Sequence, residues 1–95
     1  MSLPTLRELK SRAQQLQPAI RLGKAGPTAE FLAAFDGVLD RNHLVKVRFE
    51  AMKDERKTLS KTLAALTGSL LVQQVGHTAV YFRNRASGQD QGSFI

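Results

Sequence analysis

Short apolar stretches with strand patterns alternate along the chain with amphipathic stretches, and this alternation constrains the fold most. Residues 44–49 alternate between apolar and charged side chains, which predicts a strand with one buried face. Elsewhere, leucine, phenylalanine and alanine recur at helical spacing. We therefore expect strands over residues 19–22, 44–49, 70–75 and 78–82, and helices over residues 5–16, 29–41 and from Glu55 or Arg56 to Thr67.

The order of these elements predicts a mixed sheet with helices packed on it. A helix between consecutive strands makes those strands parallel, and such crossovers are right-handed. The last two strands are separated by Gly76-His77, the length of a two-residue hairpin. Because residues 78–82 are more continuously apolar than residues 70–75, we place the last strand inside the sheet. We expect an α/β two-layer fold, α-β-α-β-α-β-β, with a mixed four-stranded sheet in the order 1-2-4-3.

Polar residues and a glycine mark the expected helix ends. Thr5, Thr28 and Asp54 precede the three helices, so each is a candidate N-cap. Gly68 follows the third helix, where glycine is favoured because it adopts left-handed backbone angles.

Composition indicates one basic domain without cysteine. The 95 residues include 14 Lys and Arg against 8 Asp and Glu, a net charge of +6. This charge favours nucleic acid as a partner, before an anionic membrane or an acidic protein. The hydrophobic fraction of 42% suffices for one core, and the lack of cysteine excludes disulfides and thiolate metal sites. With no membrane-spanning run and no secretory signal, we expect a cytoplasmic protein. We also expect that it needs no cofactor.

The motif Gly23-Lys24-Ala25-Gly26 lies between a strand candidate and a helix start. A helix N-terminus presents free backbone N–H groups, and glycines allow another backbone to approach closely. With a lysine between the glycines, this geometry suits a phosphate, which in so basic a chain we assign to nucleic acid. The alternative is a tight strand-to-helix turn without a ligand.

Strand periodicity also separates charged from apolar side chains. Successive side chains of a strand point to opposite faces of the sheet. If the apolar set faces the helices, the other face presents Arg21, Lys46, Arg48, Tyr81 and Arg83. A basic face with an aromatic ring can hold a phosphate backbone and stack a base. The alternative is a solvated face whose charges prevent edge-to-edge pairing.

Catalytic and metal-binding patterns are not found in the sequence. His43 and His77 lie at an expected strand entry and hairpin turn, without metal-ligand spacing. No nucleophile elbow occurs, and the glycine motif lacks the lysine that follows the second glycine of a Walker A loop. We therefore predict no metal site and no enzyme activity.

Five blocks of the chain form a family pattern. They are residues 16–26, Thr28, Leu39 with Leu44-Val45-Lys46-Val47, Thr67-Gly68, and the continuous run of residues 75–83. In this order they resemble the CRM domain, named for chloroplast RNA splicing and ribosome maturation, and most of all its bacterial YhbY-type single-domain members. Two departures are His43, where the family often has glutamate, and Tyr81-Phe82-Arg83 in place of Leu-Tyr-Arg.

The resemblance implies a fold similar to the C-terminal domain of translation initiation factor three. It also implies RNA as the partner, because family members bind RNA and the bacterial ones associate with precursors of the large ribosomal subunit. The family glycine loop maps onto Gly23 to Gly26. The basic first helix of the family, expected beside that loop, maps onto the helix that carries Arg7, Lys10 and Arg12. The domain then spans residues 1–85, and residues 86–95 are expected to form a flexible tail.

Two hypotheses remain open. The first is a non-catalytic, monomeric RNA-binding module that holds ribosomal RNA precursors through the glycine loop and an adjacent basic surface. The second is a protein-interaction module that binds an acidic or ribosome-associated partner. Within the first, we expect RNA to follow the loop and the first helix, so that the loss of Lys10 and Arg12 costs more affinity than the loss of Lys46 and Arg48.

Overall fold

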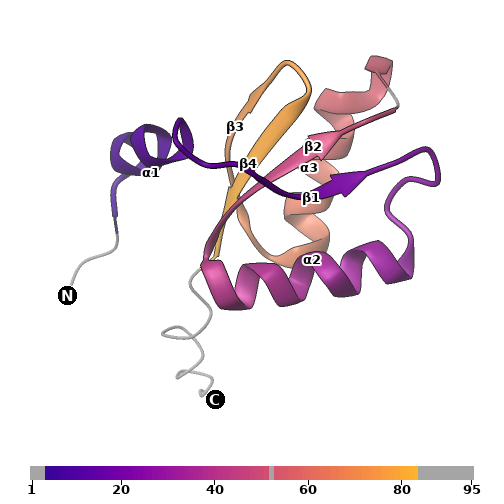
Figure 1. The fold of residues 1–95 in the computed structure, drawn as a ribbon, viewed down its shortest axis with the longest axis horizontal. Coiled ribbons are helices and arrows are strands. Elements are labelled where there is room, and N and C mark those ends of the chain that lie inside the picture. The colour runs from indigo at the N-terminus through magenta and orange to yellow at the C-terminus, as the bar shows by residue number, and fades with distance from the viewer. Residues whose placement is uncertain (1–3, 52, 84–95) are drawn as a thin grey trace.

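The computed structural model describes residues 4–51 and 53–83. Its elements are α1 (Leu6–Ala13), β1 (Pro18–Leu22), α2 (Ala29–Asn42), β2 (Leu44–Phe49), the 3₁₀ turn η1 (Lys53–Glu55), α3 (Arg56–Thr67), β3 (Leu70–Val75) and β4 (Thr78–Phe82). The four-stranded sheet has the order β1-β2-β4-β3, with β1 parallel to β2 and β4 antiparallel to both of its neighbours. The predicted fold class and strand order are confirmed (Figure 1).

Local capping explains where the first two helices begin. The Thr5 side chain accepts a hydrogen bond from the Glu8 N–H, and the Glu8 carboxylate accepts one from the Thr5 N–H, which forms a capping box. Thr28 accepts from the N–H of Phe31 in the same way. Both predicted N-caps are therefore confirmed.

One predicted helix boundary and one predicted N-cap are wrong. The first helix ends at Ala13 rather than at residue 16, and Gln14 and Gln15 form a turn. Pro18 disfavours a helical conformation at the residue before it, so the chain must leave the helix before β1 begins. The third helix has Glu55 at its N-cap, without a side-chain cap bond, and Asp54 lies in η1. Gly68 ends α3 with a φ of 65°, as predicted.

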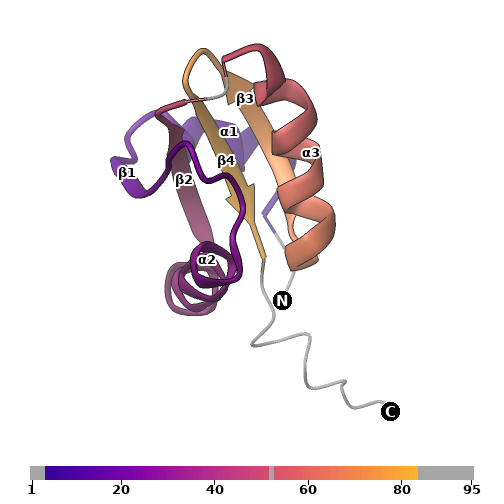
Figure 2. The same ribbon diagram turned by 90° about the vertical axis from the view of Figure 1, so that its right-hand side faces the viewer.

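The main core lies between the sheet and the layer formed by α2 and α3 (Figure 2). Figure 2 shows both helices on the same side of the sheet, which is the arrangement that two right-handed crossovers produce. The buried members of this core are Leu22, Phe35, Leu39, Val45, Val47, Phe49, Leu63, Ala79 and Tyr81.

A second, smaller core forms on the other face of the sheet, where α1 packs. Leu9 and Ala13 of α1 contact a cluster that contains Leu44, Val72 and Val80. These three strand residues point away from α2 and α3. Central strand β4 is consequently buried on both faces at Ala79, Val80 and Tyr81.

Tyr81 belongs to the main core, so its predicted place on a solvated basic face is wrong. It pairs with Val45 across β2 and β4 and thus shares the face that α2 and α3 cover. Its ring packs edge-on against Phe35, with the centroids 5.1 Å apart, and its hydroxyl donates to the Ser60 carbonyl at 3.0 Å. Burial raises the pKa of the Tyr81 hydroxyl well above its usual range. The side chain is therefore a neutral core group.

Candidate nucleic-acid interface

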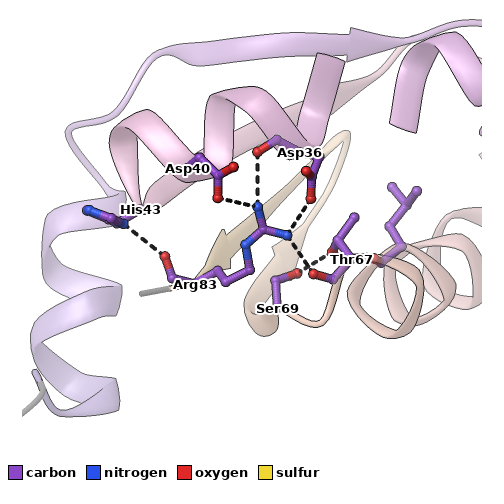
Figure 3. A network of polar contacts seen from close by, with 7 residues as sticks. Asp36, Asp40, His43, Thr67, Ser69 and Arg83 are labelled. Carbon is purple, nitrogen blue, oxygen red and sulfur yellow. Dashed lines mark hydrogen bonds and ion pairs between the residues drawn. The ribbon is translucent and has the colours of Figure 1, made fainter. Parts of the chain in front are cut away.

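Arg83 follows β4 and points into the α2 and α3 side of the molecule (Figure 3). Its Nη1 donates to Asp36 Oδ1 at 2.7 Å and to the Thr67 carbonyl at 2.6 Å. Its Nη2 donates to Asp40 Oδ1 at 2.9 Å and to the Asp36 carbonyl at 3.0 Å. Because the residue is only 6% exposed, the prediction that Arg83 lies on an open, RNA-facing surface is wrong. Arg83 instead ties together α2, the end of α3 and the sheet.

His43 belongs to the same region. It caps the C-terminus of α2 at a φ of 64°, and its ring Nδ1 lies 3.1 Å from the Arg83 carbonyl oxygen (Figure 3). The Arg83 N–H donates back to the His43 carbonyl at 2.9 Å. This histidine therefore has a structural role at the join between α2 and β2.

The glycine loop is an exposed turn at the carboxyl end of β1. The Gly26 N–H donates to the Gly23 carbonyl at 3.1 Å and closes the turn, with Lys24 and Ala25 exposed at its tip. Within the described residues, the N–H groups of Lys24 and Ala25 donate to no acceptor. The Thr28 N–H donates to the Gly26 carbonyl at 2.8 Å and fixes the entry to α2. The tip thus presents two free backbone donors and a cation at one place, as an anion requires.

The fold constrains the two glycines of this loop differently. Gly26 is buried and has a φ of 75°, a left-handed conformation that residues with a Cβ adopt at a cost. Gly23 has no such angle, and a Cβ added to it would meet no atom within 4 Å. The fold therefore requires glycine at position 26, whereas at position 23 it leaves open space for an approaching partner.

Three predicted cations lie on the face of the sheet where α1 packs. Arg21 and Arg48 are register partners on β1 and β2, and Lys46 points to the same side two residues earlier on β2. Arg21 lies 3.5 Å from Glu50 in an exposed ion pair, which contributes little to stability. In the part of the chain that the structure describes, Lys46 and Arg48 form no ion pair.

The α1 cations Arg7, Lys10 and Arg12 are exposed, as predicted, but they do not lie beside the glycine loop. Figure 1 shows α1 and the loop at opposite ends of β1. Position along β1 explains the separation, since α1 precedes the strand and the loop follows it. Lys46 and Arg48 pair in register with Pro18 and Arg21 of β1, so they lie beside the strand that connects α1 to the loop.

The helix and sheet cations meet in a hollow between the end of α1 and the first residues of β1 and β2. Arg12 and Lys46 both line it, together with Gln15, Gln17 and Asn42. The sequence analysis did not single out these three amides. The glutamine-rich stretch 14–17 was the available signal, but its position opposite Asn42 depends on tertiary packing.

Within residues 4–51 and 53–83, no three His, Asp or Glu side chains gather as a metal site. None of the helices in this part of the chain is long and apolar enough to cross a membrane. The predicted tail, residues 86–95, lies outside the described residues.

Comparisons with known proteins agree on one family. The CRS1 / YhbY (CRM) domain profile matches residues 1–83. The chain is 32% identical over 78 residues to a probable RNA-binding protein of Pseudomonas aeruginosa, covering 81% of this chain and 75% of that protein. It is 33% identical over 76 residues to an RNA-binding protein of Haemophilus influenzae, covering 79% of this chain and 77% of the relative.

A solved structure supports the same assignment. The solution structure of a Staphylococcus aureus protein, described as a candidate RNA-binding protein, superimposes with a TM-score of 0.73 at 32% identity and covers 83% of both chains. Since the family profile extends over all of the described residues and the fold agrees, the chain belongs to the CRS1 / YhbY (CRM) domain family.

Proposed function

We propose that this protein binds RNA without catalysis and acts in assembly of the large ribosomal subunit. The proposed binding site is the cationic face, by which we mean the α1 side of the sheet with the glycine loop. Its members are Arg7, Lys10, Arg12, Arg21, Gly23, Lys24, Ala25, Gly26, Lys46 and Arg48. The proposal includes a monomeric, cytoplasmic protein with ribosomal RNA precursors as its partner.

One observation carries this proposal most directly. Cations that are exposed, or half-buried in the case of Lys46, extend from α1 across the sheet to a loop with two unpaired backbone donors, and within the described residues Arg21 alone among them is in an ion pair. Cations without carboxylate partners are free to replace the counterions of a phosphate backbone. The names of the two bacterial relatives, both RNA-binding proteins, support the same partner.

The loop is the part of this face best suited to hold a phosphate directly. Ala25 is exposed at the tip between Lys24 and Gly26, so a side chain added there lies where the phosphate is expected. Gly23 leaves room for the sugar–phosphate backbone to approach the turn.

The substitution Ala25→Asp tests this assignment. A carboxylate at the tip repels phosphate, so the affinity for single-stranded ribosomal RNA fragments should fall at least tenfold, about 1.4 kcal/mol, in a fluorescence anisotropy titration. Ala25→Asn adds a side chain of the same shape without the charge and should retain most of the affinity. Thermal unfolding should show that both variants fold, because the position is exposed. Wild-type affinity in a folded Ala25→Asp protein would contradict the proposal.

A further inference from the structure

The hollow at the end of α1 combines chemical groups that a phosphate site alone does not need. Its volume of about 450 Å³ is similar to that of other open depressions on the described surface, so its lining and not its size distinguishes it. Its lining residues surround the first residues of β1, and Figure 1 shows the glycine loop at the other end of that strand. Its lining residues are Arg12, Gln15, Leu16, Gln17, Ala19, Asn42, Leu44, Val45 and Lys46, none of them acidic.

The polar side chains of this hollow are unused by the fold. Within the part of the chain that the structure describes, the side chains of Gln15, Gln17 and Asn42 form no hydrogen bond, and those of Arg12 and Lys46 form neither a hydrogen bond nor an ion pair. Amides that stabilise nothing within the protein are available to a ligand that offers both donors and acceptors.

Apolar groups form another part of the same wall. Leu16 is half-buried beside the turn that ends α1, and Leu44 is buried at the start of β2. A free anion would gain nothing from these side chains. A flat heterocyclic base would, because its faces are apolar while its edges carry donors and acceptors.

We propose that this hollow binds one unstacked RNA nucleotide and gives the protein a preference for its base. Gln17 and Asn42 hydrogen-bond to the edge of the base, which packs on the apolar wall, and Arg12 and Lys46 contact the flanking phosphates. The inference rests on the proposed RNA-binding function and deepens it, since the rest of the cationic face offers charge without base selectivity.

The position of the hollow allows one strand to reach both sites. Ala19 of β1 lines the hollow, and residues 20–22 separate it from Gly23 at the start of the loop, a distance of about 13 Å along the strand. Lys46 and Arg48 of the adjacent strand lie along this path. A single-stranded segment of a few nucleotides held at the loop can therefore place one base in the hollow.

Charge-neutral substitutions separate base recognition from general affinity. We would titrate A-, C- and U-homopolymer RNAs of equal length with the wild type, Gln17→Leu, Asn42→Leu and the double variant. Gln14→Leu is the matched control, because Gln14 is an exposed glutamine of the same stretch that does not line the hollow. Thermal unfolding shows whether each variant is folded. If the double variant does not fold, either single variant is enough for the test.

The wild type and Gln14→Leu should prefer one homopolymer by about tenfold, the discrimination that one well-formed amide–base contact provides. The hollow variants should reduce this preference to less than threefold and leave the salt dependence unchanged. The inference is overturned if the wild type binds all three RNAs equally, or if the hollow variants keep the preference. If the wild type binds none of them, the proposed RNA-binding function fails as well, which is a distinct result.

Discussion

The two faces of the sheet use their charged residues in opposite ways. On the face covered by α2 and α3, Arg83 is 6% exposed and is held by Asp36, Asp40 and the Thr67 carbonyl. On the α1 face, Arg48 is exposed and has no ion-pair partner among the described residues. An arginine side chain therefore stabilises the fold at position 83 and is available to a ligand at position 48.

This comparison shows that charge in a strand, or directly after one, does not by itself predict exposure. A guanidinium can be buried where carboxylates and carbonyls accept from its two terminal nitrogens, as they do at Arg83, and it then joins several elements at once. Removing such an arginine leaves its buried acceptors without donors, which lowers the free energy of unfolding. Removing an exposed cation costs little, because water takes its place.

The largest expected effect comes from replacing Arg83 with methionine, and the same replacement of Arg48 is the comparison. Arg83→Met removes the bonds to α2 and α3, and we expect it to lower the free energy of unfolding by about 2–3 kcal/mol. This loss of stability is smaller than the loss expected for a fully buried ion pair, because the side chains of Asp36 and Asp40 are 42% and 46% exposed. Chemical denaturation measures this change.

Arg48→Met is the matched variant on the other face. It should change the free energy of unfolding by no more than about 0.5 kcal/mol. It should weaken RNA binding, whereas folded Arg83→Met should bind RNA as the wild type does. The contrast between the faces would be contradicted if Arg83→Met were as stable as the wild type, or if it lost RNA affinity while folded.

The sequence predicted the side-chain orientations of β2 better than those of β4, for a physical reason. Strand β2 alternates between apolar and charged residues, so the opposite orientations of Val47 and Arg48 follow from its pattern. Strand β4 is buried on both faces, and a continuously apolar strand carries no period of two. Its high apolarity placed it correctly inside the sheet but could not show that Tyr81 faces α2 and α3.

The packing of α1 explains a second wrong prediction, that the α1 cations lie beside the glycine loop. The sequence indicates that Leu9 and Ala13 form an apolar stripe but not which surface the stripe covers. The structure places this stripe against Leu44 and Val80, at the far end of β1 from the glycine loop. The order of the elements, the caps at Thr5 and Thr28 and the hairpin were predictable because they depend on local sequence.

A smaller effect distinguishes fold from contact within the glycine loop. Gly26→Ala forces a Cβ into a left-handed conformation and should cost about 1–2 kcal/mol of stability. Gly23→Ala meets open space, so stability should change by no more than about 0.5 kcal/mol. It should nevertheless reduce RNA affinity about threefold, close to 0.7 kcal/mol, because the methyl group occupies the space left for the phosphate backbone.

Thermal unfolding and anisotropy titrations of the two variants measure these effects. An unstable Gly23→Ala protein would show that this glycine serves the fold. A stable Gly23→Ala protein with full affinity would show that RNA does not approach the loop closely.

The central claim is that RNA binds the α1 face of the sheet, and the salt dependence of binding tests it most directly. We would compare Lys46→Ala/Arg48→Ala and Lys10→Ala/Arg12→Ala with Arg41→Ala/Lys61→Ala, which removes as much charge from exposed positions on α2 and α3. For single-stranded RNA, the wild-type slope of log K against log salt should be about −3 to −5, roughly −0.7 for each phosphate neutralised.

The sheet pair should reduce the magnitude of this slope by about 1.4, the value for two lost phosphate contacts. The α1 pair should reduce it by less than the sheet pair does, which reverses the expectation from sequence, because Lys46 and Arg48 lie beside β1, the strand that connects α1 to the loop. The Arg41/Lys61 pair should leave the slope unchanged. A flat wild-type response would contradict RNA binding and favour a protein partner, and an equal reduction by all three pairs would contradict the assigned face.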